Sequence, residues 1–375
     1  MRALSTKGMQ RFLGNYPLSV RALRTAYSAF VSKPRAYRPL YVTFEVSNLC
    51  NLNCKMCIRN FINRKNELMD FETFKKVIDE IRPLYVGLTG YGEPLFNMDV
   101  FRMIKYAKEK NKKTIVKLFT NATLLNKERI YGLIDSGLDI LNISLESPLK
   151  TNEKIRINSN ITKITENLKL LNSAKKGGKP EVDINTVVMR DNLQDLPEMI
   201  SLVHELNAKF TLAHMTIYGK NENKEMLPSK NGREKTHFYL EKARKRAESL
   251  GESEISKDIA DYMKLVDKNW GKFAECSLFE DAACFVPWLT CYVASNGDVY
   301  PCCYFYEGSI KYGNINKNSF SEIWNSNAAR KFRENMVKNG RNYAACTTCP
   351  ENGEFLFKIF QKVPLKFLSS RKYDA

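Results

Sequence analysis

Residues 41–57 have the sequence YVTFEVSNLCNLNCKMC, and this stretch decides both the fold and the chemistry expected of the chain. Its first half is rich in β-branched and aromatic residues, which predicts a strand. Three cysteines follow directly, Cys50, Cys54 and Cys57, at Cys-x-x-x-Cys-x-x-Cys spacing. Three thiolates on one loop can bind three irons of a four-iron cluster, which leaves the fourth iron open to a small molecule. A zinc knuckle and ordinary buried thiols are the alternative interpretations.

Strand-like and helix-like segments alternate from residue 41 to about residue 217. The expected strands are residues 41–46, 84–89, 114–119, 139–145, 182–189 and 209–215. The expected helices lie near residues 71–82, 99–110, 126–136, 160–175 and 195–206. Six β units joined by helices predict parallel strands with right-handed crossovers. Ligands of such folds collect at the carboxyl ends of the strands, where the cysteines begin. Periodicity alone leaves open whether the sheet is doubly wound or a partial barrel.

The ten cysteines are unevenly placed along the 375 residues. Three lie within residues 50–57, and the other seven lie between residues 276 and 349. A secreted disulfide scaffold is short and cysteine-rich throughout, which this chain is not. Residues 1–39 contain no continuous apolar signal segment, and no apolar run reaches the length of a membrane span. We therefore expect a cytoplasmic protein, in which clustered thiols usually bind metal.

The net charge of +18 is concentrated at the two ends of the chain. Residues 1–40 contain eight Lys or Arg and no acidic residue, and residues 355–375 contain five against one Asp. Both segments mix these charges with aromatic and aliphatic residues, as surface-bound segments on anionic membranes do. We expect loose contact with the inner face of a membrane, or helices packed under the barrel. Basic charge alone is weak support for nucleic-acid binding, which we do not expect.

The cysteine triplet after the first strand resembles the radical S-adenosylmethionine (SAM) superfamily. The resemblance implies a partial (β/α)6 TIM-like barrel, a [4Fe–4S] cluster with one open iron, and SAM bound there. It also implies reductive cleavage of SAM to a 5′-deoxyadenosyl radical, which abstracts hydrogen from a substrate. Met56 stands where the family often has an aromatic residue beside the adenine, and its adaptable apolar side chain suits that place.

A second motif that resembles the family closes the second expected strand. Residues 89–94, TGYGEP, are similar to the family's Gly-Gly-Glu-Pro element. A glycine such as Gly92 lets the backbone approach a ligand closely. The resemblance assigns Glu93 to the ammonium group of SAM, which a carboxylate binds well.

Polar residues at the ends of later strands also match the family. Residues 120–122, with Asn121 at the centre, resemble its Thr-Asn-Gly element, and Ser144 stands where the family contacts the SAM ribose. Arg156 lies where many members bind the SAM carboxylate, a task that suits a guanidinium; a solvated Arg156 is the alternative. Three apolar residues could line an adenine pocket or belong to the barrel core, namely Val187, Val188 and Met215. No catalytic residue is assigned.

The second group of cysteines resembles the SPASM/twitch auxiliary-cluster domain. The resemblance rests on a Gly-x-x-x-x-Cys element at residues 297–302, on Gly-Asn-Ile at 313–315 and on a Cys-x-x-Cys element at 346–349. A full SPASM domain has seven cysteines for two clusters, but past Cys302 this chain has only Cys303, Cys346 and Cys349. We therefore expect one auxiliary [4Fe–4S] cluster, bound by Cys284, Cys302, Cys346 and Cys349. Cys291 could replace Cys284, and Cys303 could replace Cys302. Structural zinc is the main alternative metal, and Cys276 is expected to be a buried thiol.

The expected organisation has five parts. They are a basic N-terminal helical extension (1–39), the radical SAM barrel (40–220), a helical bridge (221–275), a cysteine-rich α+β auxiliary-cluster domain (276–355) and a basic apolar tail (356–375). We expect hydrogen abstraction from a peptide, small-molecule or lipid substrate in a biosynthetic or maturation pathway, with flavodoxin or ferredoxin as reductant. The alternatives are an RNA-modifying radical SAM enzyme and a non-catalytic binding protein whose fold is stabilised by a bound metal.

Overall fold

A computed structural model describes Thr25, Ser28 and residues 33–175, 178–215, 224–274, 284–305, 310–347 and 349. Most of the predicted basic N-terminal extension, the whole 356–375 tail and Cys276 lie outside these residues.

Six parallel strands form the barrel wall, in the order in which they occur along the chain. They are β1 (Tyr41–Glu45), β3 (Tyr85–Thr89), β4 (Ile115–Thr120), β5 (Ile140–Ser144), β7 (Glu181–Val188) and β8 (Lys209–His214). Within the described ranges β1 and β8 do not pair with each other. The barrel is therefore partial, which confirms the expected α/β fold. The unbroken sequential order of the strands excludes a doubly wound sheet, whose strand order reverses.

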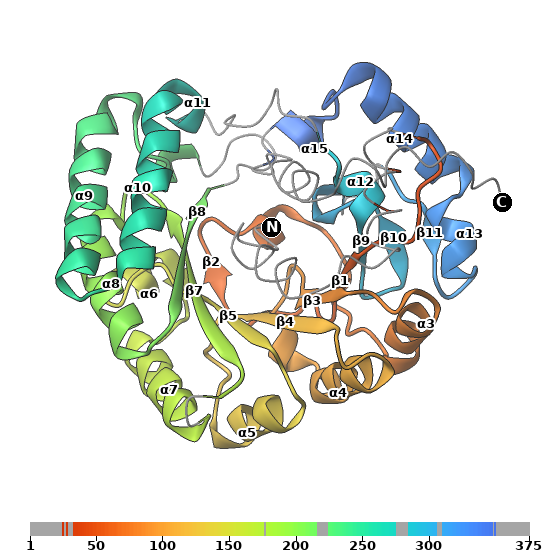
Figure 1. Cartoon of the computed structure of the whole chain (residues 1–375), viewed down its shortest axis with the longest axis horizontal. Helices are drawn as coiled ribbons and strands as arrows, with labels where there is room; N and C mark the ends of the chain where they lie inside the picture. The colour runs from red at the N-terminus through yellow and green to blue at the C-terminus, as the bar shows by residue number, and fades with distance from the viewer. Residues whose placement is uncertain are drawn as a thin grey trace, which may run out of the picture.

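Helices cover the outside of this wall, as Figure 1 shows. They are α3 (Phe71–Ile81), α4 (Val100–Lys110), α5 (Lys127–Asp135), α7 (Ile161–Ala174) and α8 (Leu196–Glu205). In α3, Asp70 caps the first turn by accepting a hydrogen bond from the Thr73 amide, and Arg82 ends the helix in a left-handed conformation. Its apolar residues recur at helical spacing, and Phe74, Val77 and Ile81 are buried against the sheet.

The C-terminal region continues the same sheet beyond β1. Strand β9 (Thr290–Val293) pairs parallel to β1, followed by the antiparallel strands β10 (Asp298–Tyr300) and β11 (Gly313–Asn314). Four helices complete this region, α12 (Val286–Leu289), α13 (Phe320–Trp324), α14 (Asn327–Asn339) and α15 (Ala344–Thr347). Its buried residues belong to the same core as those of the barrel. So short a segment buries little core alone, which explains why it shares a strand ladder with β1.

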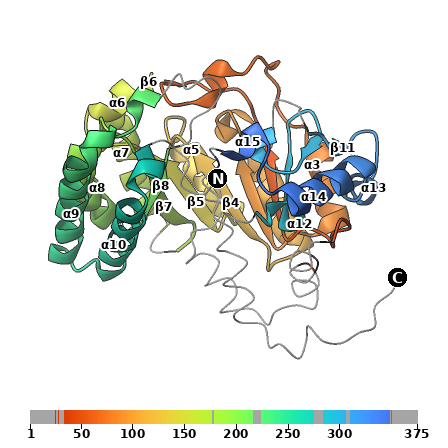
Figure 2. The same ribbon diagram turned by 90° about the horizontal axis from the view of Figure 1, so that it is seen from above.

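Three further helices lie between these regions in the sequence, α9 (Arg233–Ser249), α10 (Ser253–Lys268) and α11 (Trp270–Ala274). Helix α9 packs against α8, and α10 packs against α9 and β8. A small ribbon of β2 (Asn53–Cys54) and β6 (Arg156–Ile157) forms next to α6 (Thr151–Ile155). Figure 2 shows α6 and β6 at the same end of the barrel as the orange segment that contains the first cysteines. In the part of the chain that the structure describes, no helix combines the length and hydrophobicity that crossing a membrane requires.

Candidate active site

The loop that carries the first cysteines leaves the carboxyl end of β1 and is closed by Asn48. The Asn48 side chain donates to the Lys65 carbonyl at 2.7 Å and accepts from the Glu67 amide at 2.6 Å. We call residues 50–57 the cysteine loop. Its middle is held by the β2–β6 ribbon, in which Cys54 lies opposite Arg156. The loop is thus fastened at its start and at its middle.

The three thiols of the cysteine loop lie close together and are poorly solvated. Cys54 is buried, and Cys50 and Cys57 are half-buried. Burial raises the pKa of all three thiols, and for each of them a neighbouring cysteine raises the pKa further. Thiolates in such a group require positive charge nearby, which an iron–sulfur cluster supplies. The donor set therefore fits the cluster that the spacing predicts.

Gly92 and Glu93 lie directly beneath the cysteine loop. A Cβ atom on Gly92 would lie 2.3 Å from the Leu49 carbonyl oxygen, so only glycine permits this approach of the loop to the end of β3. Glu93 is buried, and its carboxylate accepts from the Thr120 hydroxyl at 2.6 Å, the Asn121 amide at 2.8 Å and the Leu95 amide at 3.2 Å. A carboxylate has about four acceptor sites, so one stays available for a ligand donor. Burial raises the pKa of Glu93, against the three hydrogen bonds, which lower it.

Asn121 joins the end of β4 to the cysteine loop. Its Nδ2 donates to the Asn51 side chain at 3.2 Å and contacts Cys50 Sγ at 3.8 Å. Ser144 is half-buried at the last position of β5, opposite Asn185 of β7. Both residues therefore stand at carboxyl ends of parallel strands, on the same side of the barrel as the thiols.

Arg156 is paired with Glu146 and is not solvated. Its Nη2 lies 2.5 Å from the Glu146 carboxylate, and its Nη1 lies 3.8 Å from Cys54 Sγ. Glu146 is fully buried and also accepts a hydrogen bond from the Val187 amide at 2.7 Å. Burial lowers the pKa of Arg156, but the charge of Glu146 outweighs this effect and raises the pKa above its ordinary value. The guanidinium is thus a permanent positive charge beside the cysteine loop.

A small apolar cluster lies apart from the main core. Its buried members are Ile155, Met189, Met215, Met226 and Leu227, and the half-buried Met56 and Val187 pack against it. Val188 points the other way and is fully buried in the main core. The cluster combines the cysteine loop with the ends of β7 and β8, so it forms an apolar wall next to the thiols. The methionines of this wall suit a flat ligand of variable position.

The four cysteines predicted to bind the auxiliary cluster line one pocket. Cys284, Cys302, Cys346 and Cys349 share it with apolar and aromatic side chains, among them Phe305, Phe332 and Met336, and with Arg341. Cys291 instead lies in β9 opposite Val42, buried in the core, and neither it nor Cys303 lines the pocket. Burial and the neighbouring cysteines raise the pKa of Cys302 well above its ordinary value. A pocket with four thiols and apolar walls fits a fully ligated iron–sulfur cluster.

Comparison with protein families agrees with this geometry. Residues 44–203 match the model of the radical SAM superfamily, and residues 284–350 match SPASM, an iron–sulfur cluster-binding domain. This chain belongs to the radical SAM superfamily. It is therefore an enzyme that uses a [4Fe–4S] cluster and SAM, and its SPASM domain implies auxiliary iron–sulfur clusters. The predicted family, fold and cofactors are confirmed, and a non-catalytic binding protein is excluded.

Similar proteins are modifying and maturation enzymes. The chain is 22% identical over 332 residues (82% of this chain, 86% of the relative) to the tungsten-containing aldehyde ferredoxin oxidoreductase cofactor-modifying protein of Pyrococcus furiosus. It is 26% identical over 295 residues (76% of each chain) to a PqqA peptide cyclase of Gluconobacter oxydans. In structure it resembles Streptococcus suis SuiB bound to its precursor peptide SuiA, with a TM-score of 0.61, 17% identity, and 88% of this chain and 73% of that chain covered.

Three residues that complete these sites were missed by motif analysis. Glu45 and Arg341 match no motif, and Glu146 lies two residues after Ser144 but was given no role. A signal for Glu45 was present, since an acidic residue inside a strand as apolar as YVTFEV must have a buried partner. Arg341 gave no comparable signal, although it precedes Cys346 by only five positions and lines the same pocket.

Proposed function

We propose that this radical SAM enzyme modifies a peptide, with the inner face of its barrel as the binding surface. The observation that carries the proposal is a buried polar cluster that crosses four neighbouring strands. Lys117 lies 3.0 Å from the Asp183 carboxylate, and Asn142 and Thr211 donate to the same carboxylate at 2.9 and 3.0 Å. Alternate residues of these strands pack apolar side chains against the helices, so the polar cluster occupies the inner face.

A polar inner face suits a substrate that itself carries hydrogen-bond donors and acceptors. The Oδ1 atom of Asn142 is buried and accepts no hydrogen bond within the described part of the chain, so the inner face contains an acceptor without a partner. Peptide-modifying relatives support this substrate class, since PqqA peptide cyclase and peptide-bound SuiB are similar along most of this chain. A lipid substrate gains nothing from such a surface.

The chain's own residues divide the work at the SAM site. Cys50, Cys54 and Cys57 would hold the catalytic cluster, which would supply the electron for reductive cleavage of SAM. Glu93 binds the ammonium group of SAM through its remaining acceptor site. Arg156, already paired with Glu146, orients the SAM carboxylate by its outer N–H groups.

The remaining predicted residues position the nucleoside. Asn121 and Ser144 offer polar groups to the ribose at two strand ends. Met56, with the apolar cluster that it packs against, covers the adenine. Gly92 contributes no side chain and permits the close approach of the loop.

The auxiliary pocket is assigned one [4Fe–4S] cluster, held by Cys284, Cys302, Cys346 and Cys349. A small redox protein such as flavodoxin or ferredoxin supplies the electron. The basic ends attach the enzyme loosely to anionic membranes, where each Lys or Arg near the surface contributes about 1 kcal/mol.

The test is anaerobic incubation of the reconstituted enzyme with SAM, reductant and short peptides encoded next to its gene. We expect 5′-deoxyadenosine to form and the mass of one peptide to change, both measured by mass spectrometry. Asp183→Asn should abolish peptide modification and retain SAM cleavage without substrate. Asp139→Asn is the matched control, because Asp139 is buried and paired with Lys108 outside this cluster. Formation of 5′-deoxyadenosine with the masses of all peptides unchanged would refute the proposal.

A further inference from the structure

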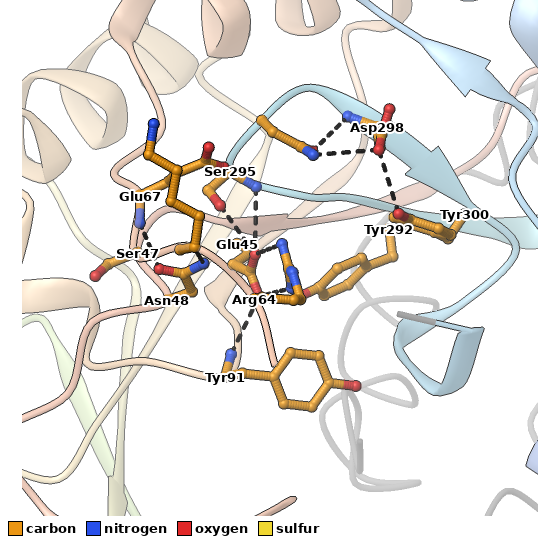
Figure 3. Close-up of polar contacts among 12 residues, drawn as sticks. Glu45, Ser47, Asn48, Arg64, Glu67, Tyr91, Tyr292, Ser295, Asp298 and Tyr300 are labelled. Atoms are coloured by element: carbon orange, nitrogen blue, oxygen red, sulfur yellow. Dashed lines mark hydrogen bonds and ion pairs between the residues drawn. The ribbon is translucent and has the colours of Figure 1, made fainter. Parts of the chain in front are cut away.

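Glu45 forms the centre of a buried polar network at the carboxyl end of β1. Its side chain has no exposed surface, and its carboxylate accepts from both terminal nitrogens of Arg64, at 2.7 and 3.1 Å. Arg64 follows the cysteine loop by seven positions. This bidentate ion pair, drawn in Figure 3, therefore fastens the segment after the cysteine loop to the last residue of β1.

The same carboxylate is bound from the auxiliary side. The Tyr292 hydroxyl donates to it at 2.7 Å, and Ser295 donates through its hydroxyl at 3.1 Å and its amide at 3.3 Å. Both residues belong to the β9–β10 hairpin, which also leads into Cys302 of the auxiliary pocket. We call residues 290–300 the auxiliary hairpin.

A third contact comes from the SAM motif. The Tyr91 amide donates to Glu45 at 3.4 Å, one residue before Gly92 and two before Glu93. A Cβ atom on Gly90 would lie 2.5 Å from Cγ of Glu45, so the motif fits closely around this side chain. The Tyr91 hydroxyl then donates to the backbone carbonyl of Cys303, the neighbour of a predicted auxiliary ligand.

One buried carboxylate thus receives six donor groups from three segments that belong to different sites. A carboxylate has about four acceptor sites, so the six donors must share the two oxygens of Glu45. A buried charge is tolerated only while its partners stay in place, and such a network moves as a unit. A shift of the auxiliary hairpin must therefore displace Tyr91 and the segment that contains Arg64, on both sides of the SAM site.

We propose that Glu45 is a positioning residue that couples the auxiliary site to the SAM site, so that an intact auxiliary site strengthens SAM binding. The coupling rests on the proposed assignment of SAM to Glu93. It requires no direct contact between Glu45 and SAM, because Tyr91 carries the displacement to Gly92 and Glu93.

The experiment measures SAM affinity and the EPR spectrum of the reduced catalytic cluster in the anaerobically reconstituted full-length enzyme. Tyr292→Phe removes one hydroxyl from the auxiliary hairpin and touches neither set of cysteines. We expect its SAM dissociation constant to rise about three- to tenfold, the range of one buried hydrogen bond. We expect Glu45→Gln to raise it further, with unchanged iron content and a weaker SAM-induced change in the EPR spectrum.

A double-mutant cycle separates coupling from simple loss of stability. Removing the auxiliary ligands by Cys346→Ala and Cys349→Ala should weaken SAM binding in the wild type and have little further effect in Glu45→Gln. Asp139→Asn, which disrupts a buried ion pair elsewhere in the barrel, should leave SAM affinity unchanged. If Glu45→Gln loses its catalytic cluster, Tyr292→Phe decides the question alone.

Two outcomes would overturn the coupling. One is an unchanged SAM dissociation constant in Tyr292→Phe with full iron content. The other is additive behaviour in the cycle, which would show that the two sites act independently. Absence of SAM cleavage by the wild type would instead refute the proposed function, so the two failures are distinguishable.

Discussion

Replacing Glu93 by Gln tests the SAM site with a change of one charge and almost no volume. Glu93 has three partners within the chain, and two of them donate to the same oxygen, Oε1. Glutamine can keep that oxygen in place. Its amide nitrogen then faces the Asn121 amide, and two donors cannot bond to each other. One buried N–H loses its partner, which costs about 1–3 kcal/mol of folding free energy.

The effect on SAM binding follows from the charge. A hydrogen bond between a carboxylate and an ammonium group contributes about 1.5–3 kcal/mol. Its loss should raise the SAM dissociation constant of Glu93→Gln about 10- to 150-fold. Both clusters should stay in place, because Glu93 is assigned to SAM and not to iron.

The measurements are anaerobic equilibrium dialysis with SAM, iron and sulfide analysis, and urea unfolding of the protein without clusters. Thr120→Val is an informative companion, because it removes only the hydroxyl that donates to Glu93. It should weaken SAM binding less than Glu93→Gln does. A collapse of iron content in Glu93→Gln would show that the residue is structural, and an unchanged dissociation constant would refute its assignment to the ammonium group.

Four further predictions concern other parts of the molecule. Reconstituted protein should contain about eight irons and eight sulfides, and replacing all three thiols of the cysteine loop by Ala should remove about half of the iron and all SAM cleavage; stoichiometric zinc with about four irons would contradict the auxiliary assignment. Arg341→Gln should lower the midpoint potential of the auxiliary cluster in an EPR redox titration, because a positive charge beside the pocket favours the reduced state; an equal potential would place the guanidinium away from the cluster. Asp70→Ala should cost about 1 kcal/mol in urea unfolding through loss of the α3 cap. Burial raises the pKa of the Asp70 carboxyl, but hydrogen bonds from Thr73 lower it below its ordinary value. The stabilisation by this cap should therefore be present at neutral pH and disappear as the pH falls through the pKa of the folded state. Full-length protein should co-sediment with anionic vesicles at low salt, less so at high salt and without residues 1–38, whereas equal sedimentation of the truncated form would remove the membrane role of the N-terminal end.

Local sequence patterns determined most of the barrel wall. Each predicted strand and helix between residues 41 and 215 begins and ends within about two residues of its predicted bounds, because alternation, capping and turn residues act over a few positions. The short elements β2, α6 and β6 were not predicted. The spacing of the cysteine loop is equally local, and a single turn brings its thiols together. The sequence also indicated that alternate residues of a strand face opposite sides of the sheet. It did not indicate which set faces the inside of the barrel. Val187 and Val188 were both candidates for the adenine pocket, and only the packing of β7 placed Val187 against the apolar cluster that Met56 also contacts and Val188 in the core.

Tertiary structure decided which distant residues meet. Spacing alone did not show which cysteines share the auxiliary pocket. Cys284 and Cys302 line it, and Cys291 and Cys303 do not, because of how the auxiliary hairpin joins β1. Glu45 and Tyr292 are 247 residues apart, yet their hydrogen bond links the two cluster regions. No local preference specifies such a contact. It forms because the free energy of burying a shared sheet and core offsets the entropy of closing so long a loop.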